Sequence, residues 1–240
     1  MKVRNRLLDT DLVIYQDEDW FKFSLDSVLL TKFVTINLRH KNIIDFATGN
    51  APIPLLLSFR TKASIYGVEY QKCVYELGKQ SVLENNKEKQ IELICDDVKE
   101  LHKRFNSDFF DVITCNPPYF KTDNIEFLND NAVKTLARHE VTLNLDDVLK
   151  QASYLLKNGG IFAMVHRTER FIEIIEKMKK YNIEPKKVQF VYPKKNRDSD
   201  LFLIEGIKNG KSGLKLLTPL VVHEDDNTYT DEVLEILNFQ

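Results

Sequence analysis

From residue 42 onward, short apolar runs alternate with amphipathic segments, and this alternation limits the possible folds more than any other feature. Runs rich in β-branched and aromatic residues predict strands at 42–46, 64–69, 91–95, 109–115, 160–166, 188–192 and 201–208. Amphipathic patterns predict helices between them at about 53–59, 71–84, 98–105, 145–157 and 168–181. Apolar strands separated by helices are typical of a parallel sheet covered on both faces. The sequence therefore predicts a doubly wound α/β fold whose mostly parallel, seven-stranded sheet ends in an antiparallel hairpin.

The length of 240 residues is typical of a single domain, which we expect to span 1–240. Residues 1–40 form an N-terminal extension with a short strand at 12–15, residues 41–210 form the core, and residues 211–240 are a polar tail expected to pack on the surface. Nowhere do 18 consecutive apolar residues occur, and the first twenty contain no long apolar stretch, so we expect a cytoplasmic protein without a membrane span.

The three cysteines, Cys73, Cys95 and Cys115, form no C-x-x-C pair, so neither a disulfide framework nor a zinc site is indicated. Each lies in an apolar context, and we expect each to be a small buried side chain. The five histidines show no ligand spacing, so no metal site is predicted.

The strand predicted at 109–115 leads into Asn116-Pro117-Pro118-Tyr119. Proline has no N–H and fixes φ, so the two prolines end the strand and stiffen the backbone there. The Asn116 amide oxygen and the Pro117 carbonyl can accept hydrogen bonds from one NH2 group, and the Tyr119 ring can stack on the planar group that carries it. These four residues are our candidate catalytic residues, the alternative being a rigid loop with a surface tyrosine.

Three other predicted strands also end in polar residues, and ligands of open α/β sheets bind beyond such ends. The first strand enters a small-residue turn between Asp45 and Gly49, and the second ends in Glu69, whose carboxylate can accept both hydroxyls of a ribose. The third leads into Asp96-Asp97, where a carboxylate can bind the amino group of an adenine. Each has a structural alternative: Asp45 and the Asp96-Asp97 pair as helix caps, and Glu69 as a solvated strand end.

In this order, Asp45-Phe-Ala-Thr-Gly49, Glu69, Asp97 and Asn116-Pro-Pro-Tyr119 resemble the class I S-adenosylmethionine-dependent amino-methyltransferases, which methylate exocyclic NH2 groups. With Gln16, segment 23–26, Leu29-Leu30 and stretch 213–220 added, nearly the whole chain resembles the bacterial tRNA (adenine-37-N6)-methyltransferase family. The resemblance implies a Rossmann-like methyltransferase fold, S-adenosylmethionine as cofactor, and N6-methylation of adenine 37 beside the anticodon of a valine tRNA.

The resemblance also implies where the cofactor binds. The implied cofactor residues, which lie at strand ends and in the N-terminal extension that closes the pocket, are Gln16, Ser24, Asp45, Ala47, Gly49, Glu69, Asp97, Val98 and Asn116. Asp45 and Gly49 would lie near the methionine end, Glu69 at the ribose, and Asp97 with Val98 at the adenine. One residue departs from the family turn Asp-x-Gly-x-Gly, because Ala47 replaces the first glycine. Its Cβ leaves less room for a positive φ, and we expect lower cofactor affinity.

The net charge of −2 shows that the chain as a whole is not a polycation, so an RNA partner needs a local basic patch. Between residues 179 and 215, ten Lys and Arg stand against four Asp and Glu. We predict that Lys194, Lys195 and Arg197 contact tRNA phosphates, and that Arg4, Arg6 and Arg138 add to this contact. The alternative is a solvated charged surface. The long polar connection at 120–143 is typical of a lid or recognition loop.

Three other functions remain open at this stage. The Asn-Pro-Pro-Tyr motif also occurs in protein-glutamine N5-methyltransferases, but the roughly forty residues before the first core strand are too few for the helical domain of those enzymes. Methylation of adenine in ribosomal RNA fits the same motif. An RNA-binding module that has a cofactor-type fold but no catalytic activity is the non-enzymatic alternative.

Overall fold

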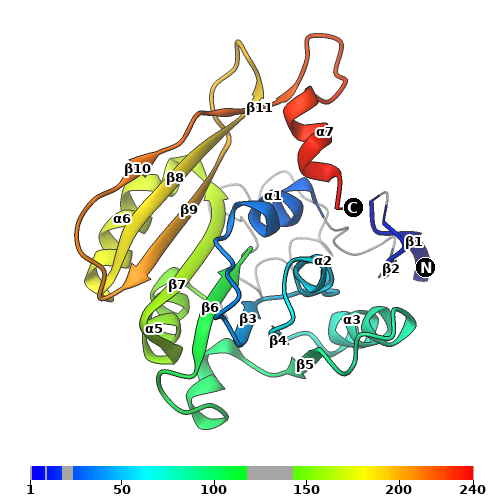
Figure 1. The fold of residues 1–240 in the computed structure, drawn as a ribbon, viewed down its shortest axis with the longest axis vertical. Helices are drawn as coiled ribbons and strands as arrows, with labels where there is room; N and C mark the ends of the chain where they lie inside the picture. Colours follow the sequence, from blue (N-terminus) through cyan, green and yellow to red (C-terminus); the bar gives the residue numbers. More distant parts are fainter. Residues whose placement is uncertain (1, 9, 18–23, 118–142, 240) are drawn as a thin grey trace, which may run out of the picture.

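A computed structural model describes residues 2–8, 10–17, 24–117 and 143–239 of the chain (Figure 1). Among these residues, nine strands form one sheet in the order β10-β8-β9-β7-β6-β3-β4-β5, and β11 also pairs with β8. The strands are β3 (Asn42–Phe46), β4 (Ser64–Glu69), β5 (Ile91–Cys95), β6 (Phe110–Cys115), β7 (Leu156–Arg167), β8 (Ile183–Lys194), β9 (Leu201–Lys208), β10 (Lys215–Leu216) and β11 (Leu220–His223). Strands β3 to β7 are parallel, and β9 runs antiparallel to both β7 and β8.

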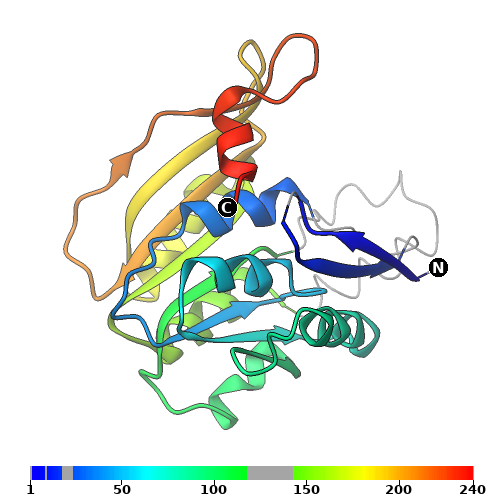
Figure 2. The same ribbon diagram turned by 45° about the vertical axis from the view of Figure 1, so that its right-hand side comes forward.

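Helices cover both faces of this sheet (Figures 1 and 2). One face packs against α1 (Leu25–Phe33), α2 (Pro52–Arg60) and α7 (Asp231–Leu237). Helix α3 (Lys72–Glu84) packs against β4 and the edge strand β5. The other face packs against the 3₁₀ helix η1 (Val98–Lys103), α5 (Leu145–Leu155) and α6 (Phe171–Lys180), which follows a 3₁₀ turn, η3 (Thr168–Arg170). The expected doubly wound α/β fold is thus confirmed.

The central strands are apolar on both faces because helices bury both. Ile43 and Ile44 are adjacent in β3, point to opposite faces, and are both fully buried in separate apolar clusters. Each such side chain contributes about 1.5–3 kcal/mol of burial free energy to folding. This two-sided burial is what the continuous apolar runs in the sequence indicate.

The tail at 211–240 adds two strands to the sheet and buried residues to the core, beyond the surface packing that the sequence predicted. Strands β10 and β11 extend the sheet in parallel along β8, and α7 packs beside α1. Leu220, Val233 and Phe239 are buried in the apolar cluster that also holds α1 and α2, and the Phe239 ring lies 6.2 Å from that of Phe59. The apolar residues of the tail follow only a weak periodic pattern, so the sequence did not single out these anchoring residues.

The prediction that all three cysteines are buried was wrong for two of them. Cys115 is buried inside β6, whereas Cys73 and Cys95 are exposed, and all three thiols are free. Cys73 lies in the first turn of α3, which buries Gly78, Ser81 and Val82 instead, and Cys95 ends the edge strand β5. An edge strand and a peripheral helix bury only part of their surface, so an apolar local sequence was a poor guide there.

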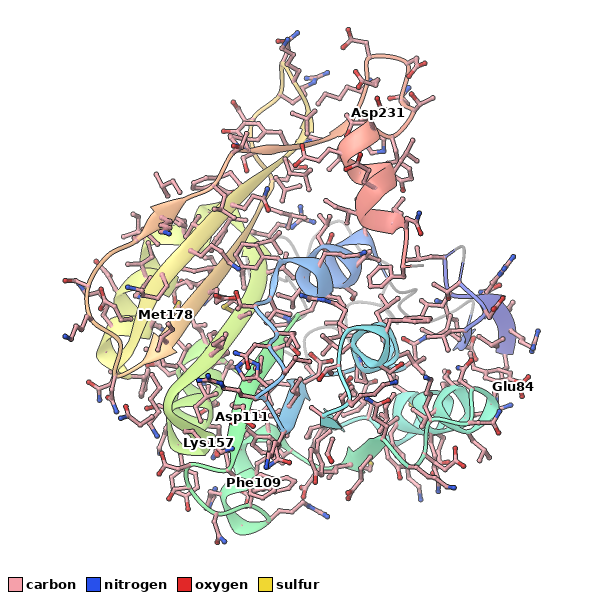
Figure 3. The ribbon with its side chains drawn as sticks, viewed as in Figure 1. Glu84, Phe109, Asp111, Lys157, Met178 and Asp231 are labelled. Atoms are coloured by element: carbon pink, nitrogen blue, oxygen red, sulfur yellow. The ribbon has the colours of Figure 1, made fainter. Side chains whose placement is uncertain are left out.

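A separate antiparallel hairpin, β1 (Lys2–Arg6) and β2 (Val13–Asp17), is attached to α3 (Figure 2). The Asn85 side chain accepts a hydrogen bond from Val13 N at 2.8 Å and donates one to Val13 O at 2.7 Å. Ser81 Oγ accepts a hydrogen bond from Tyr15 N at 2.8 Å, and Arg4 forms a 3.0 Å ion pair with Glu84, which Figure 3 labels at the end of α3. The expected short strand at 12–15 therefore exists, and it packs beside α3.

The amino ends of the strands are tied down by structural contacts. Asp111, at the start of β6, accepts hydrogen bonds from the backbone N–H groups of Lys41 and Asn42 and forms a 2.7 Å ion pair with Lys157 (Figure 3). These contacts hold the pKa of the Asp111 carboxyl below its usual range against the effect of burial. No helix in the described part of the chain is long and apolar enough to cross a membrane.

Candidate functional site

The carboxyl ends of β3, β4 and β6 lie side by side in the sheet order β6-β3-β4. The chain winds from β3 through β4 to β5 on one side and then returns to place β6 on the other side of β3. Strand order therefore reverses between β3 and β6, and this is where open α/β sheets bind ligands. Asp45, Glu69 and Asn116 come to this edge from three separate parts of the chain.

Asp45 is 1% exposed and pairs in register with Thr114 on β6. The Thr114 hydroxyl donates a 2.6 Å hydrogen bond to Asp45 Oδ1. Burial raises the pKa of Asp45 to about 7, although the nearby hydroxyls of Thr114 and Thr48 favour its ionised form. Asp45 does not cap the next helix, because Ala51 occupies the N-cap of α2, so that structural alternative was wrong.

Two buried polar atoms at the same turn have no hydrogen-bond partner of good geometry among the described residues, namely Asp45 Oδ2 and Thr48 Oγ1. Thr48 is 4% exposed. Buried polar atoms without such partners are rare in folded proteins, which makes this turn unusual among the described residues. Thr48 was not among the candidate residues predicted from the sequence, although it lies inside the turn predicted after the first strand.

The turn that follows β3 has an unusual backbone. Ala47, Gly49 and Ala51 have φ angles of 52°, 60° and 71°, all in the left-handed region. Only glycine adopts this conformation without steric cost, and an L-residue there loses roughly 1–2 kcal/mol. The sequence indicated that Ala47 has little room for a positive φ, and the structure nevertheless holds it there.

Glu69 fastens this turn to the end of β4. Its Oε2 accepts a hydrogen bond from Gly49 N at 3.0 Å, and its Oε1 accepts one from Gln71 N at 2.8 Å. Glu69 is 5% exposed, so the alternative of a solvated strand end was wrong. Burial raises the pKa of its carboxyl, while the backbone donors oppose the shift.

Asp97 caps η1, as its structural alternative proposed. Its side chain accepts a hydrogen bond from Lys99 N at 2.9 Å and lies 3.3 Å from Lys99 Nζ. Val98 is buried directly behind it. Asp96 N donates a 3.2 Å hydrogen bond to Glu69 O, which joins this loop to the end of β4. The carboxylates of Asp96 and Glu69 therefore belong to neighbouring strand ends.

Asn116 is half-buried at the end of β6, and its side chain reaches α1. The Asn116 Nδ2 group donates a 3.0 Å hydrogen bond to Ser27 Oγ. Ser27 is 4% exposed, and sequence reasoning missed it because it lies 89 positions away. Pro117 is described, whereas Pro118, Tyr119 and Arg138 lie outside the described residues.

The N-terminal extension reaches the turn after β3 through a backbone contact. Asn50 Nδ2 donates a 2.8 Å hydrogen bond to Tyr15 O, which places Gln16, buried in β2, one residue from this contact. Ser24 is exposed and occupies the N-cap of α1, three positions before Ser27. Whether Gln16 and Ser24 contact a cofactor stays a prediction.

The basic residues late in the chain do not all remain available for a partner. Lys187 forms an ion pair with buried Glu205 at 3.2 Å, and Lys208 forms one with Asp108 at 2.9 Å. Lys195 and Arg197 are exposed in the β8–β9 loop, and the neighbouring Lys194 Nζ donates a 2.9 Å hydrogen bond to Asp225 O.

The loop after β11 brings Glu224, Asp225 and Asp226 close to this β8–β9 loop. Arg4 and Arg6 are also engaged, with Glu84 at 3.0 Å and Asp11 at 3.5 Å. The basic surface is therefore smaller than the sequence indicated.

Comparison with known proteins gives a consistent picture. Residues 37–237 match the family described as "Methyltransferase domain". A protein from Bacteroides fragilis named tRNA1(Val) (adenine(37)-N6)-methyltransferase is 26% identical over 225 residues, covering 93% of this chain and 92% of the relative. A protein of the same name from Cytophaga hutchinsonii is 21% identical over 228 residues, with 93% and 92% covered.

Among solved structures, a predicted O-methyltransferase from Agrobacterium tumefaciens, protein Atu636, superimposes with a TM-score of 0.71 at 20% identity, covering 89% of this chain and 96% of that one. At this identity the likeness establishes the fold alone. It agrees with the Rossmann-like arrangement of β3 to β9.

Proposed function

Since this chain belongs to the methyltransferase domain family, we propose that it transfers a methyl group from S-adenosylmethionine to the N6 atom of an adenine in tRNA. We further propose that this adenine is at position 37, beside the anticodon of a valine tRNA, and that the reaction takes place in the cytoplasm. The observation that carries the proposal is Asn116, followed by Pro117, at the strand end next to the buried pair Asp45 and Glu69. The names of relatives aligned over 93% of the chain support the choice of tRNA.

The residues present fit S-adenosylmethionine. The cofactor carries an ammonium group, ribose hydroxyls and an adenine, and it supplies a methyl group bound to a positively charged sulfur. The buried oxygens Asp45 Oδ2 and Thr48 Oγ1 can act as acceptors for the ammonium group at the methionine end. The Glu69 carboxylate suits the ribose hydroxyls, because a carboxylate accepts up to about four hydrogen bonds. Asp97 and Val98 then lie at the adenine.

The difficulty of the reaction lies in the target nitrogen, because the lone pair of an exocyclic NH2 group is delocalised into the adenine ring. Asn116 Oδ1 and the Pro117 carbonyl can each accept one N–H of this group. Two such acceptors favour a tetrahedral nitrogen, direct its lone pair at the methyl carbon, and stabilise the positive charge that develops. No strong base is required, because the nitrogen becomes acidic only after methylation. We assign stacking on the adenine to Tyr119.

For the RNA contact, we propose that Lys195 and Arg197 contact phosphates, with Lys194 beside them. They lie in the loop between β8 and β9, and β8 ends at the same edge of the sheet as β6. Phosphate contacts from this loop position the RNA but carry no sequence information. Base stacking and the shape of the anticodon loop then select the adenine.

The test is incubation of the protein with labelled S-adenosylmethionine and, in separate reactions, total tRNA that lacks the modification, ribosomal RNA and a release factor, followed by mapping of the modified residue. We expect N6-methyladenosine at position 37 of a valine tRNA. Label found only in ribosomal RNA, or on a glutamine of a release factor, would overturn the tRNA assignment. No transfer to any of these would overturn the methyltransferase activity.

The variant Asn116→Ala tests the assignment of the catalytic residue. We expect the transfer rate to fall about 100-fold or more, while the Kd for S-adenosylmethionine changes by less than about threefold, because the lost contacts are to the target amine. Equal losses of transfer and cofactor binding would mean that Asn116 supports the pocket rather than the chemistry.

A further inference from the structure

Two loops in the terminal part of the sheet lie next to each other (Figures 1 and 2). One joins β8 to β9, and the other, residues 224–230, joins β11 to α7. His223 at the end of β11 is in register with Lys194 at the end of β8, and His223 Nδ1 lies 3.3 Å from Pro193 O. Lys194 Nζ also donates a hydrogen bond to Asp225 O. The two loops therefore form one continuous surface.

A stacked pair of rings lies on this surface. His223 and Tyr229 face each other across an antiparallel bridge, and their ring centroids are 5.1 Å apart with an interplanar angle of 21°. The His223 ring covers one face of the tyrosine, yet Tyr229 remains 40% exposed. An exposed aromatic ring that is supported from behind can stack on a further planar group with its other face.

Backbone contacts hold this ring pair in place on both sides. Glu224 N donates a 2.9 Å hydrogen bond to Thr228 O, and Thr230 N donates one to Val222 O at 3.1 Å. The Thr230 hydroxyl donates a 2.8 Å hydrogen bond to Val221 O, and the same side chain caps α7. The rings therefore have little conformational freedom to lose when a ligand binds.

The charges on the two loops decide which part of an RNA each loop can contact. The β8–β9 loop carries both signs, Lys194, Lys195, Arg197, Asp198 and Asp200, whereas the other loop carries only carboxylates, Glu224, Asp225 and Asp226. Asp226 Oδ1 accepts hydrogen bonds from Thr228 N at 3.0 Å and from its hydroxyl at 2.6 Å, so this carboxylate is turned into its own loop. Carboxylates repel phosphates, so the loop at 224–230 offers an RNA the face of its ring, which suits a base.

The ring pair lies at the same edge of the sheet as Asn116 but well away from it. Strands β8 and β11 run in the same direction as β6, and the path from β6 to β11 crosses β7, β9 and β8. Four steps of about 4.8 Å give a separation of about 19 Å across the sheet. A base stacked on Tyr229 is therefore a different base from the adenine at Asn116.

We propose that Tyr229, supported by His223, is a stacking site for an unpaired base of the substrate tRNA other than the target adenine. This inference rests on the proposed action on tRNA. Because every base has a flat face, the site adds affinity and fixes how the RNA lies across the edge, with little choice among the four bases.

The test measures tRNA binding by Tyr229→Ala, with Tyr154→Ala as the control. Tyr154 is 42% exposed, and its ring also contacts a histidine, His102, but edge-on at 90°. We expect Tyr229→Ala to raise the Kd for unmodified tRNA about tenfold, whereas Tyr154→Ala should stay within about twofold of the wild type. The salt dependence of binding should not change in Tyr229→Ala, because loss of stacking involves no counterions. Unchanged tRNA affinity of Tyr229→Ala would overturn the proposal.

Two further variants separate stacking from support of the loop. Tyr229→Phe keeps the ring and should bind tRNA like the wild type, whereas Tyr229→Leu keeps apolar bulk without a ring and should lose about as much affinity as Tyr229→Ala. Wild-type affinity of Tyr229→Leu would mean that the residue only fills space, and this also overturns the proposal.

Unmodified tRNAs that each carry one abasic nucleotide at an unpaired position then locate the stacked base. One such position, other than the target adenine, should weaken binding to the wild type about tenfold and binding to Tyr229→Ala less than about twofold. Equal losses for both proteins at every position would contradict the stacking site. Absence of methyl transfer to tRNA by the wild-type protein would instead contradict the proposed function itself.

Discussion

At the scale of single residues, the turn after β3 contains backbone strain at Ala47 that a glycine would avoid. Ala47 and Gly49 both have left-handed backbones, but only Gly49 adopts this conformation without steric cost. The Gly49 N–H is held by Glu69, and Asp45 enters the turn buried and linked to Thr114. The strain at Ala47 and the raised pKa of Asp45 are both tolerated next to the atoms proposed to bind the cofactor.

We predict that Ala47→Gly raises the free energy of unfolding by about 0.5–1 kcal/mol. Relief of the left-handed strain outweighs the larger unfolded-state entropy of glycine. Gly49→Ala makes the opposite change. Nothing lies within 4 Å of a Cβ added at Gly49, so this variant introduces only the strain of a left-handed backbone. It should lower the unfolding free energy by roughly 1–2 kcal/mol. Urea denaturation measures the unfolding free energy of both variants. A change of the same sign in the two variants would contradict the strain argument.

We predict that the stability contributed by Asp45 depends on pH. Its pKa of about 7 in the folded protein lies above the ordinary aspartate value of 3.8, so between these values the native state keeps a proton that the unfolded state has released. The unfolding free energy of the wild type relative to Asp45→Asn should therefore fall as pH rises from about 4 to 7, by at most about 1.4 kcal/mol per pH unit, and level off above 7. Denaturation curves at pH 5, 6 and 8 test this, and a difference that does not vary with pH would contradict it.

At the scale of elements, helix α3 and the turn after β3 hold the N-terminal hairpin in place. Helix α3 carries the N-terminal hairpin through Asn85 and Ser81, and Asn50 links the hairpin to the turn after β3. Gly78 lets α3 approach this turn, because an added Cβ would lie 3.2 Å from the Asn50 backbone. The hairpin is therefore coupled to the turn after β3 both directly, through Asn50, and through α3.

We predict that Asn85→Ala loosens the hairpin without unfolding the core. The variant loses both hydrogen bonds to Val13, which is expected to cost about 1–3 kcal/mol locally. Amide hydrogen exchange of Val13 and Tyr15 should accelerate about tenfold or more, while exchange in β3 and β6 stays unchanged. Glu88→Ala, an exposed change close to Asn85 in sequence, is the control. Unchanged exchange at Val13 would mean that the hairpin is held by other contacts.

At the scale of the whole molecule, the amino ends and the carboxyl ends of the strands carry different kinds of side chain. The amino edge is joined by structural contacts such as Asp111 with Lys157, whereas the carboxyl edge carries Asp45, Glu69, Asn116 and the loop between β8 and β9. Among the described residues, the carboxyl ends of the strands combine the buried acceptors Asp45 and Glu69 with the exposed cations Lys195 and Arg197. Any RNA that presents a base to Asn116 must therefore lie across this edge.

We predict that replacing Lys194, Lys195 and Arg197 together by Glu weakens tRNA binding about tenfold or more and reduces its dependence on salt concentration, because phosphate contacts release fewer counterions. The matched control replaces Arg39, Lys62 and Lys89, exposed residues before β3, β4 and β5, by Glu. This control makes the same change in net charge at the opposite edge. Equal effects of the two triple variants would show that only overall charge matters.

Much of the fold and part of the site could be predicted from the sequence by itself. The alternation of apolar runs predicted β3 to β9 and the doubly wound sheet, and the prolines after Asn116 predicted where β6 ends. These features depend on periodicity and on φ restrictions, which act within a few residues of each other. Placing Asp45, Glu69 and Asn116 at strand ends required only the direction of parallel strands.

Only the tertiary structure decided which side chains meet. Thr114 reaches Asp45 because β6 lies beside β3, and Ser27 reaches Asn116 because α1 covers that face of the sheet. The burial of Glu69 and of Phe239, and the exposure of Cys95, likewise depend on neighbours that are distant in the chain. Burial and hydrogen bonding between distant segments arise from packing, and local sequence patterns carry little information about them.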